Sequence, residues 1–294
     1  MTIQSQIQLF GEVLFDHFPD GSRVLGGAPF NVAWHLQALG CVPNFVSRVG
    51  DDKQGREILQ AMRQWGMSPG GMQIDETHPT GCVQVTLQGG EPCYEIIADC
   101  AYDFINSRQL APEVTEGVLY HGTLALRHPV ALEALQALKA RHQGRIFIDV
   151  NLRAPWWREQ AVSAWLQDAD WVKLNQDELA QLSEPEVKPE EAMQVLRERY
   201  DLETVVVTCG EKGALACNRQ GDICVVEPAP ALTVVDTVGA GDAFAAVLLL
   251  GMLQDWSLSI ALQRAQTLAS ALVGRRGATV FDPDFYRVIA KDWH

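Results

Sequence analysis

The sequence is poor in basic residues and lacks any long apolar run. It holds 23 Lys and Arg against 37 Asp and Glu, for a formal net charge of −14. This balance argues against general binding to nucleic acid or anionic membranes, because both need clustered positive charge. The longest apolar run, residues 243–253, is shorter than a membrane span, which takes roughly 18 residues or more. We therefore expect neither a nucleic-acid nor a membrane partner.

Three patterns that would assign the chain to familiar classes are also missing. No Walker phosphate loop (Gly-x-x-x-x-Gly-Lys followed by Ser or Thr) occurs. The seven cysteines are odd in number and form no Cys-x-x-Cys, so free thiols in a reducing compartment are expected rather than disulfides or a metal site. The first six residues lack the apolar centre of a signal peptide. These absences favour a soluble, cytoplasmic protein.

The order of apolar patterns predicts an α/β fold. Between Val118 and Thr208, short apolar strands alternate with segments whose apolar residues are spaced by three and four. This alternation predicts a mostly parallel central sheet with helices on both faces, where ligands bind at the carboxyl ends of strands. At 294 residues the chain can form one large core, and we expect a single domain over residues 1–294.

Outside that region the patterns predict four further elements. An apolar-rich strand is expected from Ile7 to Phe15, and a helix from Pro29 to Leu39. Residues 80–98 alternate apolar and polar around Gly89-Gly90, which predicts a hairpin with one exposed face. The β-branched run Thr233-Val234-Val235 predicts the end of a strand just before the most informative stretch of the chain.

That stretch is Asp236-Thr-Val-Gly-Ala-Gly-Asp242, followed by an apolar segment that predicts a buried helix. Gly239 and Gly241 therefore lie at a turn that opens a helix, where unpartnered N–H groups and the helix dipole favour an anion. Asp242 would be an awkward charge there unless it served as a general base for a hydroxyl that attacks a bound phosphate. The alternative is an ordinary helix-entry turn with an acid in its first turn.

The same stretch resembles the C-terminal signature of the ribokinase/PfkB family of sugar kinases. The resemblance implies that Gly239, Ala240 and Gly241 form an anion hole and that Asp242 is the catalytic base. It also implies that Asp236 contributes to a monovalent-cation (K⁺) loop. The implied fold is ribokinase-like with a small β-sheet lid, its strands near residues 12–25 and 80–98, through which relatives often form homodimers.

The N-terminal part resembles the same family at its sugar-binding residues. Asp16 matches the first sugar-binding Asp, Gly26-Gly27 the glycine pair that hinges the lid and contacts the sugar, and Asn31 the residue that binds sugar hydroxyls. Without the resemblance, Gly26-Gly27 could be a simple turn and Asn31 a helix cap or an exposed polar residue. Residues 101–104 follow the hairpin, and either a place near the acceptor pocket or a surface loop is open for them.

Three more motifs come directly after predicted strands. Arg153 ends an Asp-x-Asn-x-Arg run similar to fructokinase-like relatives, where it would face phosphate or sugar oxygens; a surface salt bridge is the alternative. Asn175 and Glu178 could form only a capping box, but the resemblance implies nucleotide binding by Asn175 and a Mg²⁺ site at Glu178, held mostly through water. The resemblance further implies nucleotide binding by a turn that could also be a plain hairpin: Thr208, Gly210 and Gly213.

Together these residues predict an ATP-dependent kinase that phosphorylates a hydroxyl of a free sugar. Fructose is the favoured acceptor, because Asp149 to Arg153 and residues 101–104 resemble fructokinases more than ribokinases. Ribokinase, 2-keto-3-deoxygluconate kinase and nucleoside kinase activities are the alternatives within the family. From other classes, a non-catalytic sugar or nucleotide sensor and a nicotinamide-dependent oxidoreductase remain, although the glycine fingerprint of the latter is absent.

Overall fold

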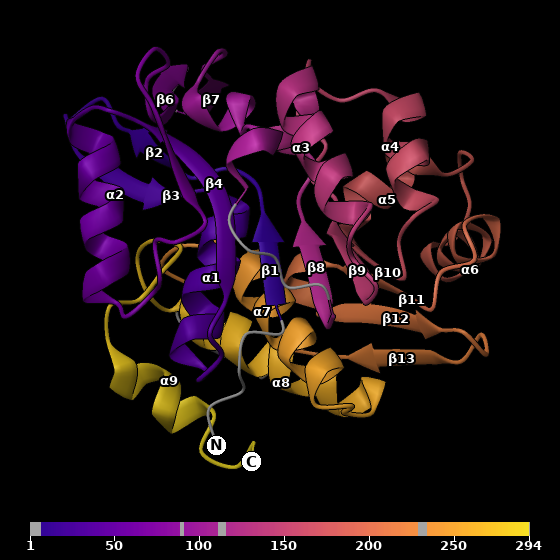
Figure 1. Cartoon of the computed structure of the whole chain (residues 1–294). Helices are drawn as coiled ribbons and strands as arrows, with labels where there is room; N and C mark the ends of the chain where they lie inside the picture. Colours follow the sequence, from indigo (N-terminus) through magenta and orange to yellow (C-terminus); the bar gives the residue numbers. More distant parts are fainter. Residues whose placement is uncertain (1–6, 89–90, 111–115, 229–233, 294) are drawn as a thin grey trace.

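The computed structural model describes residues 7–88, 91–110, 116–228 and 234–293. Its centre is a nine-stranded sheet with the strand order β13-β12-β11-β10-β9-β8-β1-β4-β5 (Figure 1). The strands from β11 to β5 are parallel, and β12 and β13 are antiparallel to their neighbours. The bounds are β1 (Ile7–Phe10), β4 (Asn44–Gly50), β5 (Met72–Asp75), β8 (Val118–His121), β9 (Arg145–Asp149), β10 (Trp171–Asn175), β11 (Thr204–Thr208), β12 (Ala214–Asn218) and β13 (Ile223–Val226).

Helices cover both faces of this sheet, as the sequence predicts. Side chains of neighbouring strand residues alternate between two apolar cores, so that Tyr120 belongs to one core and Leu119 to the other. One core is closed by α1 (Ala28–Ala38), α2 (Lys53–Gln64), α7 (Ala240–Leu253), α8 (Leu258–Val273) and α9 (Pro283–Ile289). The other is closed by α3 (Pro129–Lys139), α4 (Glu159–Leu166), α5 (Gln176–Leu182) and α6 (Pro189–Arg199).

A second, four-stranded sheet lies beyond the carboxyl end of β1, at the upper left of Figure 1. Its order is β3-β2-β6-β7, with bounds β2 (Leu14–His17), β3 (Arg23–Gly26), β6 (Gly81–Gln88) and β7 (Glu91–Ile96). Strands β6 and β7 form the predicted antiparallel hairpin, and the expected turn at Gly89-Gly90 lies outside the described residues. The small sheet thus occupies the two segments from which we expect a lid.

The predicted strand from Ile7 to Phe15 is wrong, because the chain leaves the large sheet at Phe10 and enters the small one at Leu14. The break falls at Gly11, where an added Cβ would lie 2.4 Å from Cγ of Pro29. Gly11 and Glu12 lie at this break, but the residues on either side of them are apolar because both strand ends that meet here are buried. Hydrophobicity alone therefore could not show that this run serves two sheets.

Other elements also differ from the sequence-based expectation. Val234 and Val235 belong to no strand and are exposed, while Thr233 lies outside the described residues. The backbone N–H of Val235 instead donates to Val273 O of α8, at 2.9 Å. Strands β5, β12 and β13 and helix α9 are present without having been predicted.

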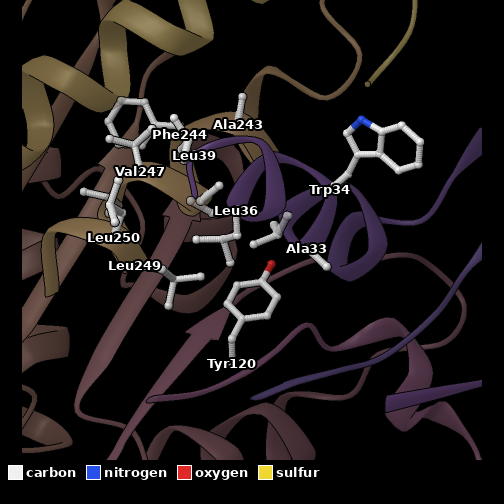
Figure 2. Packing of buried hydrophobic residues seen from close by; sticks show 14 of the residues in the cluster. Ala33, Trp34, Leu36, Leu39, Tyr120, Ala243, Phe244, Val247, Leu249 and Leu250 are labelled. Carbon is white, nitrogen blue, oxygen red and sulfur yellow. The ribbon is translucent and has the colours of Figure 1, made fainter. Parts of the chain in front are cut away.

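Helix α7 is buried along almost its whole length, because every residue from Ala243 to Met252 is inaccessible to solvent or nearly so. Its apolar side chains meet those of α1, and Figure 2 shows Phe244, Val247 and Leu250 near Leu36 and Leu39. This packing fixes the two helices whose first turns carry Asn31 and Asp242. Within the described part of the chain, no helix is both long and apolar enough to cross a membrane.

Asp52 ties the small sheet to the large one. It is the N-cap of α2, where its Oδ1 accepts hydrogen bonds from the Gly55 amide at 2.7 Å and the Thr80 hydroxyl at 2.8 Å. Its Oδ2 accepts a bond from the Thr80 amide at 2.8 Å, just before β6 begins. One carboxylate therefore holds the start of α2 and the start of β6, one of the two inner strands of the small sheet.

We predict that Asp52→Ala lowers the free energy of unfolding by about 1–2 kcal/mol, because it removes a helix cap and leaves the Thr80 amide without its partner. Asp51→Ala is the matched control, since the Asp51 carboxylate is 63% exposed and pairs with the equally exposed Arg56. Urea denaturation of both variants measures the difference. Equal midpoints for the two variants would contradict an anchoring role for Asp52.

Candidate active site

A cavity of about 610 Å³ opens at the carboxyl ends of β10 and β11. Its wall includes all four residues predicted to bind nucleotide: Asn175, Thr208, Gly210 and Gly213. The same wall contains Ala240 and Gly241 of the predicted anion hole, and apolar side chains of α7 and α8 complete it. The structure thus brings together two predicted motifs that are far apart in sequence, in a cavity of the size that small-molecule ligands occupy.

The turn that opens α7 can be formed only with glycine at position 239. Gly239 is the N-cap and has φ 80°, a left-handed conformation that other residues rarely adopt. A Cβ at this position would also lie 2.5 Å from Cα of Ala278. The amides of Gly241 and Asp242 follow in the first turn, where the helix itself supplies no acceptor. The Ala240 amide makes a long bond, 3.4 Å, to Thr237 O.

Asp242 is half-buried and is held by a residue from the other end of the chain. Asn31 Nδ2 donates a hydrogen bond of 2.7 Å to Asp242 Oδ2. Burial raises the pKa of the Asp242 carboxyl to about 7, against the lowering effect of the Asn31 bond. The charge of Asp149 raises this pKa further, whereas Lys173 and Arg153 lower it. A carboxyl with a pKa near neutrality, facing a polar partner, is suited to accept a proton.

Lys173 is a site residue that the sequence analysis missed. It lies in β10 and is only 6% exposed, and its Nζ donates a 2.7 Å hydrogen bond to Asp149 Oδ1. Tyr120 OH donates to the other oxygen, Oδ2, of Asp149 at 3.2 Å. Burial lowers the pKa of the Lys173 ammonium, but the neighbouring carboxylate outweighs burial and the net pKa is raised. A charged residue within the otherwise apolar Trp-Val-Lys-Leu strand was the available sequence clue.

The predicted sugar-binding residues gather at the junction of the two sheets. Asp16 lies in β2, and its Oδ2 would be 3.3 Å from a Cβ added to Gly26, so its carboxylate covers this glycine. Burial raises the pKa of Asp16 to about 6. Gly27 has φ 106° and caps α1 in contact with the backbone of residue 12. Asn31 is buried, and its Oδ1 has no hydrogen-bond partner, which leaves an acceptor for a ligand hydroxyl.

Glu12 is a second buried charge whose role the sequence analysis did not anticipate. It is 1% exposed, and its Oε2 has no hydrogen-bond partner. Burial raises its pKa to about 7, partly offset by its own backbone N–H, and the charge of Asp242 raises it further. Glu12 and Asp242 are therefore electrostatically coupled, and the ionisation of one opposes the ionisation of the other.

Arg153 and residues 101–104 are the other positions that the sequence analysis placed near the acceptor. Arg153 is exposed, and its charge reaches Asp242. Residues 101–104 form a buried 3₁₀ turn, not a surface loop, in which Asp103 pairs with Arg127 through two bonds of 2.7 Å. Tyr102 of this turn packs against Leu14 and Val83, so the turn contributes to the apolar cluster under the small sheet.

The predicted metal residues are fixed by backbone amides. Glu178 Oε1 and Oε2 accept hydrogen bonds from the amides of Leu152 (3.1 Å) and Asn175 (2.9 Å), and Asn175 caps α5 in return. Asp236 accepts bonds from the amides of Val238 and Gly277, both at 3.0 Å. The described residues contain no group of three or more potential metal ligands. A lone, immobilised carboxylate fits Mg²⁺ that is bound through water and phosphate oxygens.

The chain matches the family model described as pfkB family carbohydrate kinase over residues 5–284. The protein belongs to the pfkB family of carbohydrate kinases. Among curated pfkB relatives, a fructokinase of Klebsiella pneumoniae is 32% identical over 265 residues, covering 85% of this chain and 85% of the relative. Fructokinase-2 of Oryza sativa subsp. japonica is 30% identical over 274 residues, covering 85% of this chain and 80% of the relative.

Solved structures of pfkB-type kinases show the same fold. A fructokinase from Vibrio cholerae O395 has a TM-score of 0.81 at 27% identity and covers 94% of both chains. Aminoimidazole riboside kinase from Salmonella enterica has a TM-score of 0.84 at 25% identity, covering 96% of this chain and 99% of that one. The predictions of a ribokinase-like fold and of a fructokinase-like sugar kinase are thereby confirmed.

The raised pKa of Asp242 predicts that Asp242→Asn stabilises the protein above neutral pH. Between about pH 4 and pH 7 the native state keeps a proton that the unfolded chain has already lost, so the stability contributed by this group falls as pH rises. We expect the gain in free energy of unfolding to be roughly 1 kcal/mol or more larger at pH 8 than at pH 5. Urea titrations at the two pH values measure it.

Asp177→Asn serves as the control, because Asp177 is exposed on α5 beyond the cavity wall. This variant should show no such pH-dependent gain. A gain for Asp242→Asn that is equal at both pH values would contradict the raised pKa.

Proposed function

We propose that this kinase transfers the γ-phosphoryl group of ATP to a hydroxyl of free fructose, with Asp242 as general base. The observation that carries the proposal is the Asp242 carboxylate: it has a pKa near 7, it lies beside the amides that open α7, and Asn31 orients it. The whole chain, residues 1–294, would act as one kinase domain, with the four-stranded sheet as its lid.

The reaction follows from this arrangement. The sugar hydroxyl gives its proton to Asp242 as its oxygen forms a bond to the γ-phosphorus. The bond between that phosphorus and the bridging oxygen to the β-phosphate breaks, and ADP leaves. The amides of Gly239, Ala240 and Gly241, with that of Asp242, stabilise the charge on the phosphoryl oxygens. The lid would exclude water, which would otherwise compete with the sugar as acceptor.

The nucleotide and the metal have their own residues in this proposal. Asn175, Thr208, Gly210 and Gly213 would bind ATP, since all four line the cavity beside the anion hole. Mg²⁺ held near Glu178 would neutralise phosphate charge. Solved structures of similar fructokinases are described with bound ADP and with bound ATP, which supports ATP as the co-substrate.

Free fructose is the acceptor we favour. Asp16, Gly26, Gly27 and Asn31 present a carboxylate, backbone and an unpartnered amide oxygen, which suit hydroxyl groups, and Arg153 would close the site. The Vibrio cholerae fructokinase structure is described as bound to fructose, ADP and a potassium ion. A K⁺ ion near Asp236 and a homodimer formed through the lid are further parts of the proposal.

We predict that Asp242→Asn lowers kcat by about 10²–10⁴-fold while ATP still binds, because only proton transfer is lost. Coupled detection of ADP and calorimetric titration of ATP measure the two quantities. Asp177→Asn is an equally conservative change at an exposed position of α5 and should leave both kcat and ATP binding unchanged. A kcat of Asp242→Asn near that of the wild type would show that Asp242 is not the general base.

A panel of acceptors decides the substrate. Fructose, ribose, 2-keto-3-deoxygluconate and a nucleoside are each incubated with ATP, and products are identified by mass. We expect fructose to gain one phosphoryl group with the highest kcat/KM. A nucleoside is included because the Salmonella enterica neighbour is an aminoimidazole riboside kinase. A higher kcat/KM for another acceptor would show that fructose is not the preferred substrate. ATP binding without any phosphorylated product would favour a non-catalytic sugar or nucleotide sensor.

A further inference from the structure

Lys173 is a charged residue buried within a strand of the large sheet. It is 6% exposed, two residues before the end of β10, between apolar neighbours. Burying an ammonium is unfavourable unless it is well paired. One of its three N–H donors is used by Asp149 Oδ1 at 2.7 Å. Two further donors are therefore available to whatever else the side chain faces.

The ammonium faces the glycine turn that opens α7. A Cβ added to Gly241 would lie 3.6 Å from Lys173 Nζ, with no other atom within 4 Å of it apart from its chain neighbours and the backbone of its own helix. Gly241 also lines the cavity. The absence of a side chain at position 241 thus leaves open space between the turn and the ammonium, next to the amides proposed to hold the phosphoryl group.

Three carboxylates act electrostatically on this buried cation. Asp149, Asp242 and Glu178 all act on the charge of Lys173, and only Asp149 is bonded to it. If Lys173 served only to neutralise Asp149, it would have no reason to lie among the proposed base, the proposed metal ligand and the anion hole. Its position instead suits a group that carries several negative charges into this space.

We propose that Lys173 is a catalytic residue whose ammonium binds an oxygen of the phosphoryl group during its transfer from ATP to the sugar. The proposal rests on the function proposed above and adds to it a fixed positive charge opposite the amides of the anion hole. The charge of the transferred group is spread over three oxygens, so donors on two sides are engaged together. A lysine in a low-dielectric site acts there as a strong point charge.

Steady-state kinetics of Lys173→Met provide the first test. We expect kcat to fall by about 10²–10³-fold with the KM for fructose changed by less than about threefold, because the lost contact forms with the phosphoryl group. Lys139→Met is the matched control: Lys139 pairs with Asp168 at 3.0 Å on α3, and losing that pair should leave kcat unchanged. A kcat of Lys173→Met near that of the wild type overturns the proposal.

A mutant cycle separates catalysis from the neutralisation of Asp149. Lys173→Met leaves the Asp149 carboxylate buried without its cation, whereas the double variant with Asp149→Asn removes both charges. We expect Asp149→Asn alone to turn over about 10²-fold faster than the double variant, since it retains the ammonium. Equal turnover of these two would show that Lys173 acts only through Asp149, and the proposal would fail.

Binding of a phosphoryl mimic tests the contact without a sugar. ADP is titrated with Mg²⁺, with and without fluoroaluminate, which imitates the transferring group. We expect fluoroaluminate to tighten ADP binding in the wild type and to do so at least about tenfold less in Lys173→Met. Equal tightening overturns the proposal. If the wild type phosphorylates no sugar, the proposed function fails, and this titration still decides the role of Lys173.

Discussion

The hydrogen bond between Asn31 and Asp242 joins residues 211 positions apart and sets the geometry of the site. Asn31 lies in the first turn of α1 and Asp242 in the first turn of α7, and the two helices pack through an apolar interface (Figure 2). The bond lowers the pKa of a carboxyl that burial raises. The Asp242 carboxylate is therefore held by a hydrogen bond while its pKa stays near 7. Packing of the two helices thus places this contact, and the contact in turn affects the pKa of Asp242.

The same contact lies between the small sheet and the turn that opens α7. Gly27 is the N-cap of α1 and follows β3 directly, so the small sheet leads without a loop into the helix that carries Asn31. At the other end, Gly239 packs against Ala278, whose carbonyl lies 3.1 Å from Nε2 of the buried His35 of α1. Helix α1 therefore contacts both Asp242 and the segment that packs against Gly239.

Sequence patterns could predict most of this site because parallel sheets collect their functional residues at one edge. Arg153, Asn175 and Thr208 each follow a strand or end it, and topology alone brings such positions together. The glycines at 239 and 241 could be predicted for a different reason. A helix that opens at an anion site needs backbone without side chains, and this requirement is visible in the sequence itself.

The residues that were missed owe their roles to tertiary contacts. In the run from Ile7 to Phe15, Gly11 and Glu12 interrupt a largely apolar pattern, but only the close approach of Gly11 to Pro29 reveals that the run serves two sheets. Lys173 and Glu12 lie in apolar segments where a lone charge gives no periodicity, and their partners lie in distant elements. A buried charge is costly wherever it occurs, so its persistence within a strand indicates a partner that the strand cannot supply. For Lys173 that reasoning leads from Asp149 to the phosphoryl group, because Asp149 uses only one of its three donors.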